Sequence, residues 1–131
     1  MPGFFTTIFG TTAVTSDRAK DPTLRSRYYR LSRERIWPMI METLANMPDC
    51  KITHEVQNVG EVLLVRKTIT GRVQDITITV IQENPLKTSV DVYSASEDSI
   101  WRLGDLGSNY RLIQRFFKLL DERAAAHKLN H

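Results

Sequence analysis

Cysteine is the scarcest informative residue in this chain. Cys50 is the only one among 131 residues, so a disulfide within these residues is excluded, and we expect a cytoplasmic protein. Its thiol also lacks a cysteine or histidine partner at the spacing of a zinc site. The composition therefore predicts a fold held together by its core, with no structural metal and no disulfide.

Long apolar runs are missing too. No stretch approaches the ~18 residues of a membrane-spanning helix. The first 16 residues include Phe4, Phe5 and Phe9, yet no basic residue precedes Arg18, which is unlike a secretory signal. Phosphate-loop, dinucleotide-binding, nucleophile-elbow and zinc-protease motifs are absent. We accordingly expect no transmembrane segment and no cofactor.

Neither sign of charge is in clear excess over most of the chain. Residues 1–35 contain seven basic and three acidic residues, whereas residues 36–131 contain eleven basic and twelve acidic ones. Only the first segment should attract an anionic partner. There Arg25 to Arg30 interleaves with Tyr28 and Tyr29, which suits an acidic protein or an anionic membrane; the pattern is too short to predict nucleic-acid binding.

The length fits one domain. We expect an N-terminal basic and aromatic arm (1–30), a single α+β domain (31–124) and a C-terminal tail (125–131). The phenylalanines of the arm, from Phe4 to Phe9, would be an aggregation liability if exposed. They are predicted to pack on the domain, on a membrane surface, or on a second copy of the chain as a homo-oligomer.

Periodicity predicts a helix at each end of the domain. The first is capped by Ser32 and has apolar residues at helical spacing from Ile36 to Met47. Pro38 predicts that it begins closer to Arg35 or kinks. The last follows residues 105–109, with Ile113, Phe116, Phe117 and Leu120 on one face.

Four alternating segments lie between the helices, at about residues 52–57, 61–69, 73–82 and 88–93. Short turns join them, so we expect a four-stranded antiparallel meander. One face is β-branched and apolar; the other bears acids, threonines and Tyr93. The predicted fold is an α+β two-layer sandwich in α-β-β-β-β-α order, with both helices on one face. His54, aligned with Ile52 and Val56, should be half-buried.

Residues 90–113, VDVYSASEDSIWRLGDLGSNYRLI, resemble a family signature. Ser94-Ala95-Ser96 ends a strand, and Asp105-Leu106-Gly107-Ser108-Asn109 (D-L-G-x-N) leads into a helix with Arg111 and Ile113. This is similar to the domain of unknown function 1499 family, and the resemblance covers roughly residues 50 to 120. The basic residue that the family places after the serines is displaced here to Arg102. The resemblance implies an intracellular or membrane-associated α+β domain and no particular reaction.

The strand-loop-helix corner has two interpretations. In the structural one, Asp105 or Ser108 caps the helix and Asn109 bonds across to the backbone of Ser94 to Ser96. In the functional one, the helix N-terminus and nearby polar groups bind an anion or polar ligand. The candidate ligand-binding residues are Ser94, Ser96, Arg102, Asp105, Asn109 and Arg111.

The leading functional hypothesis is a non-enzymatic module that uses this corner for an unknown ligand or protein partner, with the groove between the last helix and the sheet as a second candidate surface. The alternative is a small enzyme of unknown reaction, using Asp75 and Asp105 with Arg102 and Arg111. It requires a concave pocket in which these groups converge. Asp75, Asp91 and Asp105 are not joined by histidines at ligand spacing, so no metal site is predicted.

Overall fold

The computed structural model describes residues 12–67, 71, 73–96 and 108–129. Within them the chain forms a seven-stranded antiparallel sheet, two α-helices and two 3-10 turns. The strands are β1 (Thr12–Val14), β2 (Arg27–Tyr29), β3 (Cys50–Val56), β4 (Glu61–Lys67), β5 (Val73–Asn84), β6 (Lys87–Ser96) and β7 (Lys128–Leu129). The helices are α2 (Arg33–Ala45) and α3 (Ser108–Arg123), and the turns are η1 (Pro22–Leu24) and η3 (Ala125–His127).

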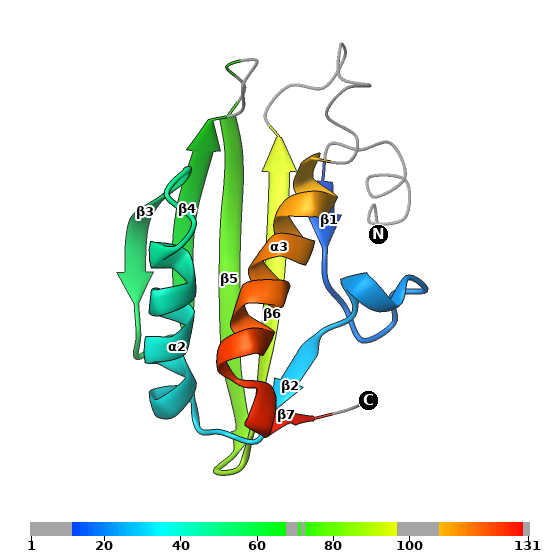
Figure 1. The fold of residues 1–131 in the computed structure, drawn as a ribbon, viewed down its shortest axis with the longest axis vertical. Helices are drawn as coiled ribbons and strands as arrows, with labels where there is room; N and C mark the ends of the chain where they lie inside the picture. Colours follow the sequence, from blue (N-terminus) through cyan, green and yellow to red (C-terminus); the bar gives the residue numbers. More distant parts are fainter. Residues whose placement is uncertain (1–11, 68–70, 72, 97–107, 130–131) are drawn as a thin grey trace.

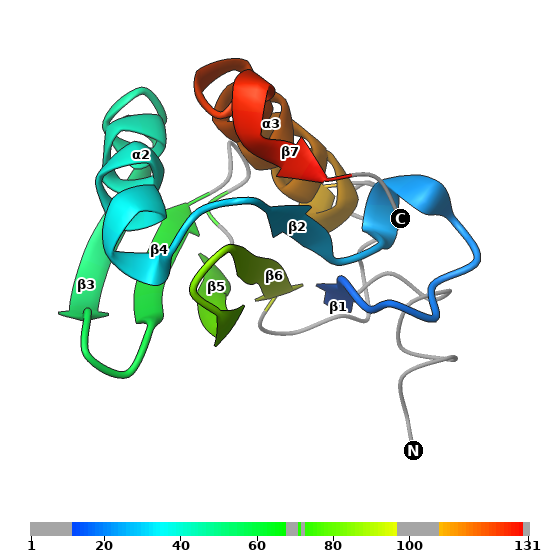
Figure 2. The same cartoon turned by 90° about the horizontal axis from the view of Figure 1, so that it is seen from below.

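Two layers make up the molecule, a sheet and a pair of helices. Figure 1 shows α2 and α3 running along the sheet, and Figure 2 shows both on the same side of it. The α+β class, the antiparallel sheet and the placement of both helices on one face are therefore confirmed. The apolar face of α3 is buried as predicted: its four stripe residues are at most 2% exposed, namely Ile113, Phe116, Phe117 and Leu120.

Strands β3 to β6 pair in chain order within the larger sheet, and alternation explains their faces. Ile76, Ile78 and Val80 of β5 are buried under the helices, as are Val90 and Val92 of β6. No helix of the described residues lies over the outer face (Figure 2), and there Asp75 and Tyr93 are exposed. Burial of apolar side chains on one face and solvation of the other thus fix the register between β5 and β6.

The prediction of a four-stranded sheet was wrong, because three short strands extend it beyond β6. Both β1 and β2 pair antiparallel with the same edge of β6, β1 near its end and β2 near its start. Strand β7 then pairs with β2. Their segments are two or three residues long, too short for alternation to reveal them. Residues 1–11 lie outside the described part, so oligomerisation through Phe4 to Phe9 stays a prediction.

A register shift in β3 overturns the expectation for His54. Ile52 pairs with Leu64 and His54 with Leu63, so Thr53 is an extra residue in the ladder. Such a bulge reverses the side on which later residues point. His54 is consequently exposed, and so is Val56, at 38%.

Helix α2 begins at Arg33, directly after its predicted cap. The Ser32 hydroxyl accepts a hydrogen bond from the Arg35 N–H. Pro38 lies inside the helix, so its missing N–H does not prevent the helix from forming. Ile36, Ile40 and Met47 are buried against the sheet, which confirms the predicted face. Packing of that face outweighs the local cost of the proline.

Candidate functional site

A buried polar network joins the first turn of α3 to the sheet. The Ser94 hydroxyl donates to Asn109 Oδ1 at 2.6 Å, and Asn109 Nδ2 donates to Ser96 Oγ at 3.0 Å. Ser94 and Asn109 are at most 1% exposed, and Ser96 is 8% exposed. Asn109 was predicted to bond to the backbone of Ser94 to Ser96; in the structure its bonds go instead to the two serine side chains. Buried groups that satisfy one another in this way stabilise a fixed geometry.

Gln74 of β5 extends the network. Its Nε2 donates to Asn109 Oδ1 at 2.9 Å and to Ser108 Oγ at 3.0 Å. Its Oε1 accepts from Arg66 of β4 at 2.7 Å. Arg66 and Gln74 are register partners on adjacent strands. The network therefore runs from β6 through α3 and β5 to a charged group at the surface.

That charged group belongs to a bridge of two arginines and one carboxylate. Arg66 Nε donates to Asp49 Oδ2 at 2.7 Å, and an Arg115 terminal nitrogen donates to both Asp49 oxygens at 3.0 and 2.7 Å. Burial alone would raise the pKa of Asp49, but the bonds from Arg115 and Arg66 outweigh it and lower that pKa. Asp49 is therefore a firmly ionised partner at neutral pH.

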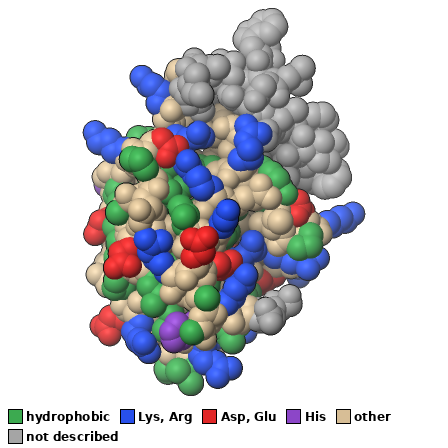
Figure 3. All heavy atoms as spheres, viewed as in Figure 1, with side chains coloured by type: hydrophobic (Ala, Val, Ile, Leu, Met, Phe, Trp, Pro, Cys, Tyr) green, Lys and Arg blue, Asp and Glu red, His purple; other side chains and the backbone are tan. Residues whose placement is uncertain are grey.

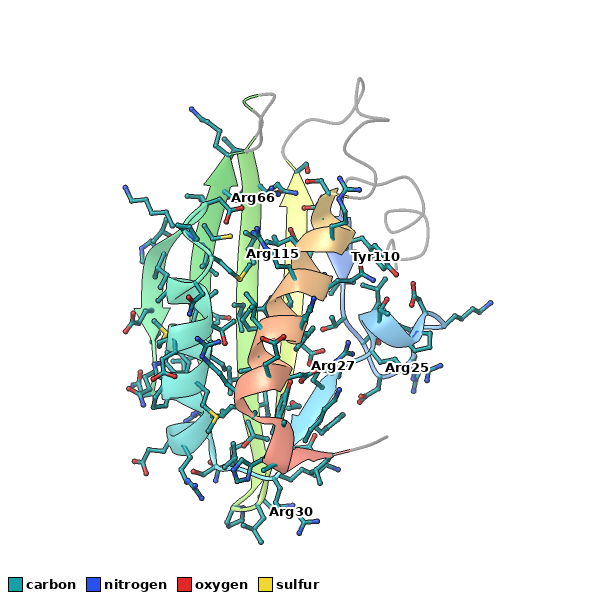
Figure 4. All side chains as sticks on the ribbon, viewed as in Figure 1. Arg25, Arg27, Arg30, Arg66, Tyr110 and Arg115 are labelled. Carbon is teal, nitrogen blue, oxygen red and sulfur yellow. The ribbon has the colours of Figure 1, made fainter. Side chains whose placement is uncertain are left out.

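A small pocket opens beside this bridge. It has a volume of about 190 Å³ and is lined by Arg66, Ser108, Arg111, Leu112 and Arg115. Figure 4 shows Arg66 and Arg115 approaching one another between the sheet and α3. The Arg111 side chain is exposed and makes no hydrogen bond or ion pair within the described residues. We call these three side chains the arginine pocket: Arg66, Arg111 and Arg115.

The pocket is more basic than the surface around it. Figure 3 shows basic and acidic side chains interspersed over the helix-covered face. Three arginines line the pocket, however, and Asp49 is the one carboxylate bonded to them in the part of the chain described. Arg111 and Arg115 are four residues apart on a helix, where like charges repel. Arg111 also lies near the positive end of the α3 dipole, where cations are unfavourable. A bound anion would relieve both costs.

The structure brings together only some of the predicted site residues. Ser94, Ser96 and Asn109 meet in the buried network, and Arg111 lies at the pocket beside it. Arg102 and Asp105 lie outside the described residues. The polar groups of Ser94, Ser96 and Asn109 bond to one another, so among the described residues the accessible part of the corner is the arginine pocket.

The other two acids that we considered lie elsewhere. Asp75 alternates with the buried Gln74 and Ile76 and points from the opposite face of the sheet. Asp91 accepts hydrogen bonds from Thr15 at 2.6 Å and Ser26 at 2.5 Å. Within the ranges that the structure describes, no three acidic, histidine or cysteine side chains cluster as a metal site would require.

Sequence reasoning missed Asp49, Arg66, Gln74 and Arg115. Two of them could have been found from the sequence pattern. Arg66 and Gln74 occupy inward positions of strands whose other inward residues are apolar, such as Leu64 and Ile76. A polar residue at such a position needs an internal partner. Asp49 and Arg115 are far apart in the chain and exposed, so only the fold reveals their contact.

The space between α3 and the sheet holds no second site. A cavity of about 10 Å³ remains there, lined by apolar side chains that include Leu112 and Phe116. This is at or below the space that one water molecule needs. The groove that we considered for a ligand is therefore filled by the helix's own side chains in the described structure.

Comparisons with known proteins agree with this fold. A family model described as "Protein of unknown function (DUF1499)" matches residues 9–120. No curated protein matches the chain. A START superfamily protein from Mycobacterium smegmatis is 11% identical, with a TM-score of 0.50 over 89% of this chain and 99% of that one.

Two further solved structures are more distant in shape. An uncharacterised protein from Bacillus thuringiensis has a TM-score of 0.47 at 11% identity, over 87% of this chain and 98% of its own. A conserved protein from Geobacillus kaustophilus has a TM-score of 0.41 at 15% identity, over 78% and 94%. At such identities the likeness concerns the fold and not the activity. Among the described residues, no helix is long and apolar enough to cross a membrane.

Proposed function

The chain belongs to the DUF1499 family, whose function is unknown, and we propose that it is a non-enzymatic module that binds a small anionic group in the arginine pocket. The observation that carries this proposal is the convergence of Arg66, Arg111 and Arg115 on one cavity of about 190 Å³. That volume is below the roughly 300–1,000 Å³ of drug-sized ligand sites. It suits one phosphate, sulfate or carboxylate group.

The Arg66 guanidinium is held in place by its neighbours, which favours a role in binding. Arg66 is held by Asp49 on one side and by Gln74 on the other, at 2.7 Å each. Gln74 is itself fully buried. A guanidinium fixed by its neighbours loses little freedom when a ligand binds, so more of each new hydrogen bond appears as affinity.

The enzyme alternative has less support. Asp75 is on the opposite face of the sheet from Arg111, so these two groups do not converge on one substrate. Asp105 lies outside the described residues. The pocket itself presents cations and a hydroxyl, with no general base paired to a nucleophile. The cytoplasmic location likewise stays a prediction.

The test is calorimetric titration of the full chain with inorganic phosphate and, separately, with acetate. Arg111→Gln removes an exposed cation that makes no hydrogen bond or ion pair with the described residues, so we expect the fold to be kept. We expect affinity to fall about tenfold, the equivalent of one charge-assisted hydrogen bond. Lys118→Gln is the matched control, since it removes one charge from an exposed position of the same helix outside the pocket. Equal losses in the two variants, or no heat with either anion, would overturn the proposal.

A further inference from the structure

The segment between β1 and β2 is an insertion in one edge of the sheet. Val14 pairs with Tyr93 of β6 and Arg27 pairs with Val90, so the partner strand advances by three residues while this segment advances by thirteen. A much shorter connection would join the same two pairs. Surface loops carry binding and catalytic residues more often than the elements that they connect. We call residues 15–26 the edge loop.

Asp91 closes the base of the edge loop. It lies opposite the gap between the two short strands, and one carboxylate oxygen accepts from Thr15 Oγ1 at 2.6 Å and from Ser26 Oγ at 2.5 Å. Thr15 Oγ1 also accepts from the Val92 N–H at 2.9 Å. Thr15 and Ser26 are the first and last residues of the loop, so the ends of the loop are clamped to one side chain.

Hydrogen bonds also fix the body of the loop. Asp21 caps the turn η1, and the Tyr110 hydroxyl of α3 lies 3.0 Å from Asp21 Oδ2 and 2.8 Å from Thr23 Oγ1. Arg25 donates to the carbonyl of Ala19 at 2.9 Å. Arg27 donates to the carbonyl of Arg25 at 2.7 Å and lies over the Phe117 ring, 4.6 Å from its centroid. Figure 4 shows these two arginines beside η1 and β2. The loop is thus held in one shape.

A groove of about 700 Å³ lies between this loop, β2 and β7. Five basic side chains and one acidic one line it: Arg18, Lys20, Arg25, Arg27, Lys128 and Asp17. Lys128 is paired with Asp121 at 2.9 Å. The other four cations form no ion pair within the described part of the chain. Arg25 and Arg27 donate to uncharged carbonyls. Asp17 opposes part of the charge. Hydrogen bonds from Thr23, and after them the charge of Arg25, lower the pKa of the nearby Asp21. Basic side chains nevertheless outnumber acidic ones in the described lining, so the groove keeps a net positive charge.

We propose that the groove enclosed by the edge loop is a second binding site, for a compact ligand that carries two or more phosphate groups. Two phosphate groups bring roughly −3 to −4 charges in a small volume, which matches four cations opposed by Asp17. The volume lies within the range of small-molecule sites. An acidic peptide would spread the same charge along a longer chain than the groove encloses.

Single-stranded nucleic acid fits the groove less well. Such ligands stack their bases on exposed aromatic rings. Tyr28 and Tyr29, the aromatic residues of this basic segment, are 7% and 0% exposed. The hydroxyl of Tyr28 donates to Asp17 at 2.7 Å, and that of Tyr29 donates to Asp121 at 2.6 Å. Both rings are part of the fold and offer no stacking surface.

The experiment is calorimetric titration of the full chain with tripolyphosphate at low ionic strength, with citrate as the carboxylate comparison. The double variant Arg18→Gln with Lys20→Gln removes two exposed cations whose side chains make no hydrogen bond or ion pair with the residues that the structure describes. We expect it to weaken tripolyphosphate binding at least tenfold, from the loss of two charge-assisted contacts. The control is Arg30→Gln with Arg35→Gln, two exposed cations outside the groove, which should change affinity less than about twofold.

Each other result counts against the proposal. Equal effects of the two double variants would show a general charge effect and overturn it. Citrate binding as tightly as tripolyphosphate would overturn the phosphate class, and absence of tripolyphosphate binding would overturn the site. The arginine pocket is tested separately, because Arg111→Gln should leave tripolyphosphate affinity unchanged. Loss of binding in that variant instead would place the ligand in the arginine pocket.

Discussion

Asn109 shows how one side chain holds two layers together. Its Oδ1 accepts from Ser94 and from Gln74, and its Nδ2 donates to Ser96. The residue is 1% exposed, so water is not at hand to replace any of these partners. The single amide therefore ties the start of α3 to β5 and β6 and fixes the orientation of the residues that follow it, Arg111 included.

Replacing Asn109 with alanine should destabilise the protein by about 3 kcal/mol, because buried donors and acceptors on several partners lose their hydrogen bonds. Urea unfolding followed by circular dichroism measures this. Gln114→Ala is the control, since Gln114 is a half-buried amide on the same helix and should cost less than about 0.5 kcal/mol. A small loss at Asn109 would contradict a structural role for the network.

At the same scale, the sequence predicted the corner better than the pocket. The contact of Asn109 with Ser94 and Ser96 followed from the resemblance and from the need to satisfy polar groups near a helix start. Arg66 and Gln74 were readable as inward polar residues among apolar ones. Asp49 and Arg115, 66 residues apart, meet only after the layers have packed. No local pattern contains that information.

Among the elements, the turn between β3 and β4 depends most sharply on one residue. Gly60 has φ of +85°, and a Cβ built on it would lie 2.2 Å from the carbonyl oxygen of Val80 in β5. The Gly60 carbonyl in turn accepts from the Val80 N–H at 2.7 Å. Glycine is required here both by the left-handed backbone and by the close approach of the neighbouring strand.

Gly60→Ala should therefore cost clearly more than Gly71→Ala. Gly71 has the same φ of +85°, but no atom of the described residues beyond its chain neighbours lies within 4 Å of an added Cβ. The second variant carries the backbone strain alone, on the order of 1 kcal/mol. The first adds a backbone clash, and we expect a further ~2 kcal/mol. Chemical denaturation of the two variants in parallel gives the comparison, and equal losses would refute the clash.

Helices and long strands were predictable because each repeats a pattern over several turns or pairs. Helix α3 and strand β5 are the clearest cases, with buried residues at the predicted positions. The bulge at Thr53 and the short strands β1, β2 and β7 were not predictable in this way. A three-residue strand contains less than two periods of alternation, so its pairing is decided by partners far away in the chain.

For the molecule as a whole, one core between the sheet and the helices carries the stability. Phe116 is 2% exposed and packs edge-on against Phe117, with ring centroids 5.2 Å apart. Phe116→Ala should cost about 3–5 kcal/mol by removing a large buried side chain. Leu86→Ala, at a position that is 66% exposed, should cost less than about 0.5 kcal/mol. Thermal unfolding measures both variants, and similar melting temperatures for the two would contradict a single shared core.

The class of fold and the family could both be predicted from the sequence, and the family match confirms the second. The number of strands could not. The segment that precedes α2 was predicted as an arm because it lacks periodicity, yet two of its pieces find partners on β6. This segment is polar and basic because it also contains the edge loop, residues 15–26.

The pairing of β1 and β2 with β6 bears on how the protein is made. The β6 partners of residues 12–29 lie 59 to 83 residues further along the chain, so they follow only after roughly 3–17 s at ordinary synthesis rates. Until then this stretch, with its two tyrosines and its arginines, has no strand beside it. Closure of that edge therefore waits for the synthesis of β6, unlike that of a chain whose first strands pair with each other as a hairpin.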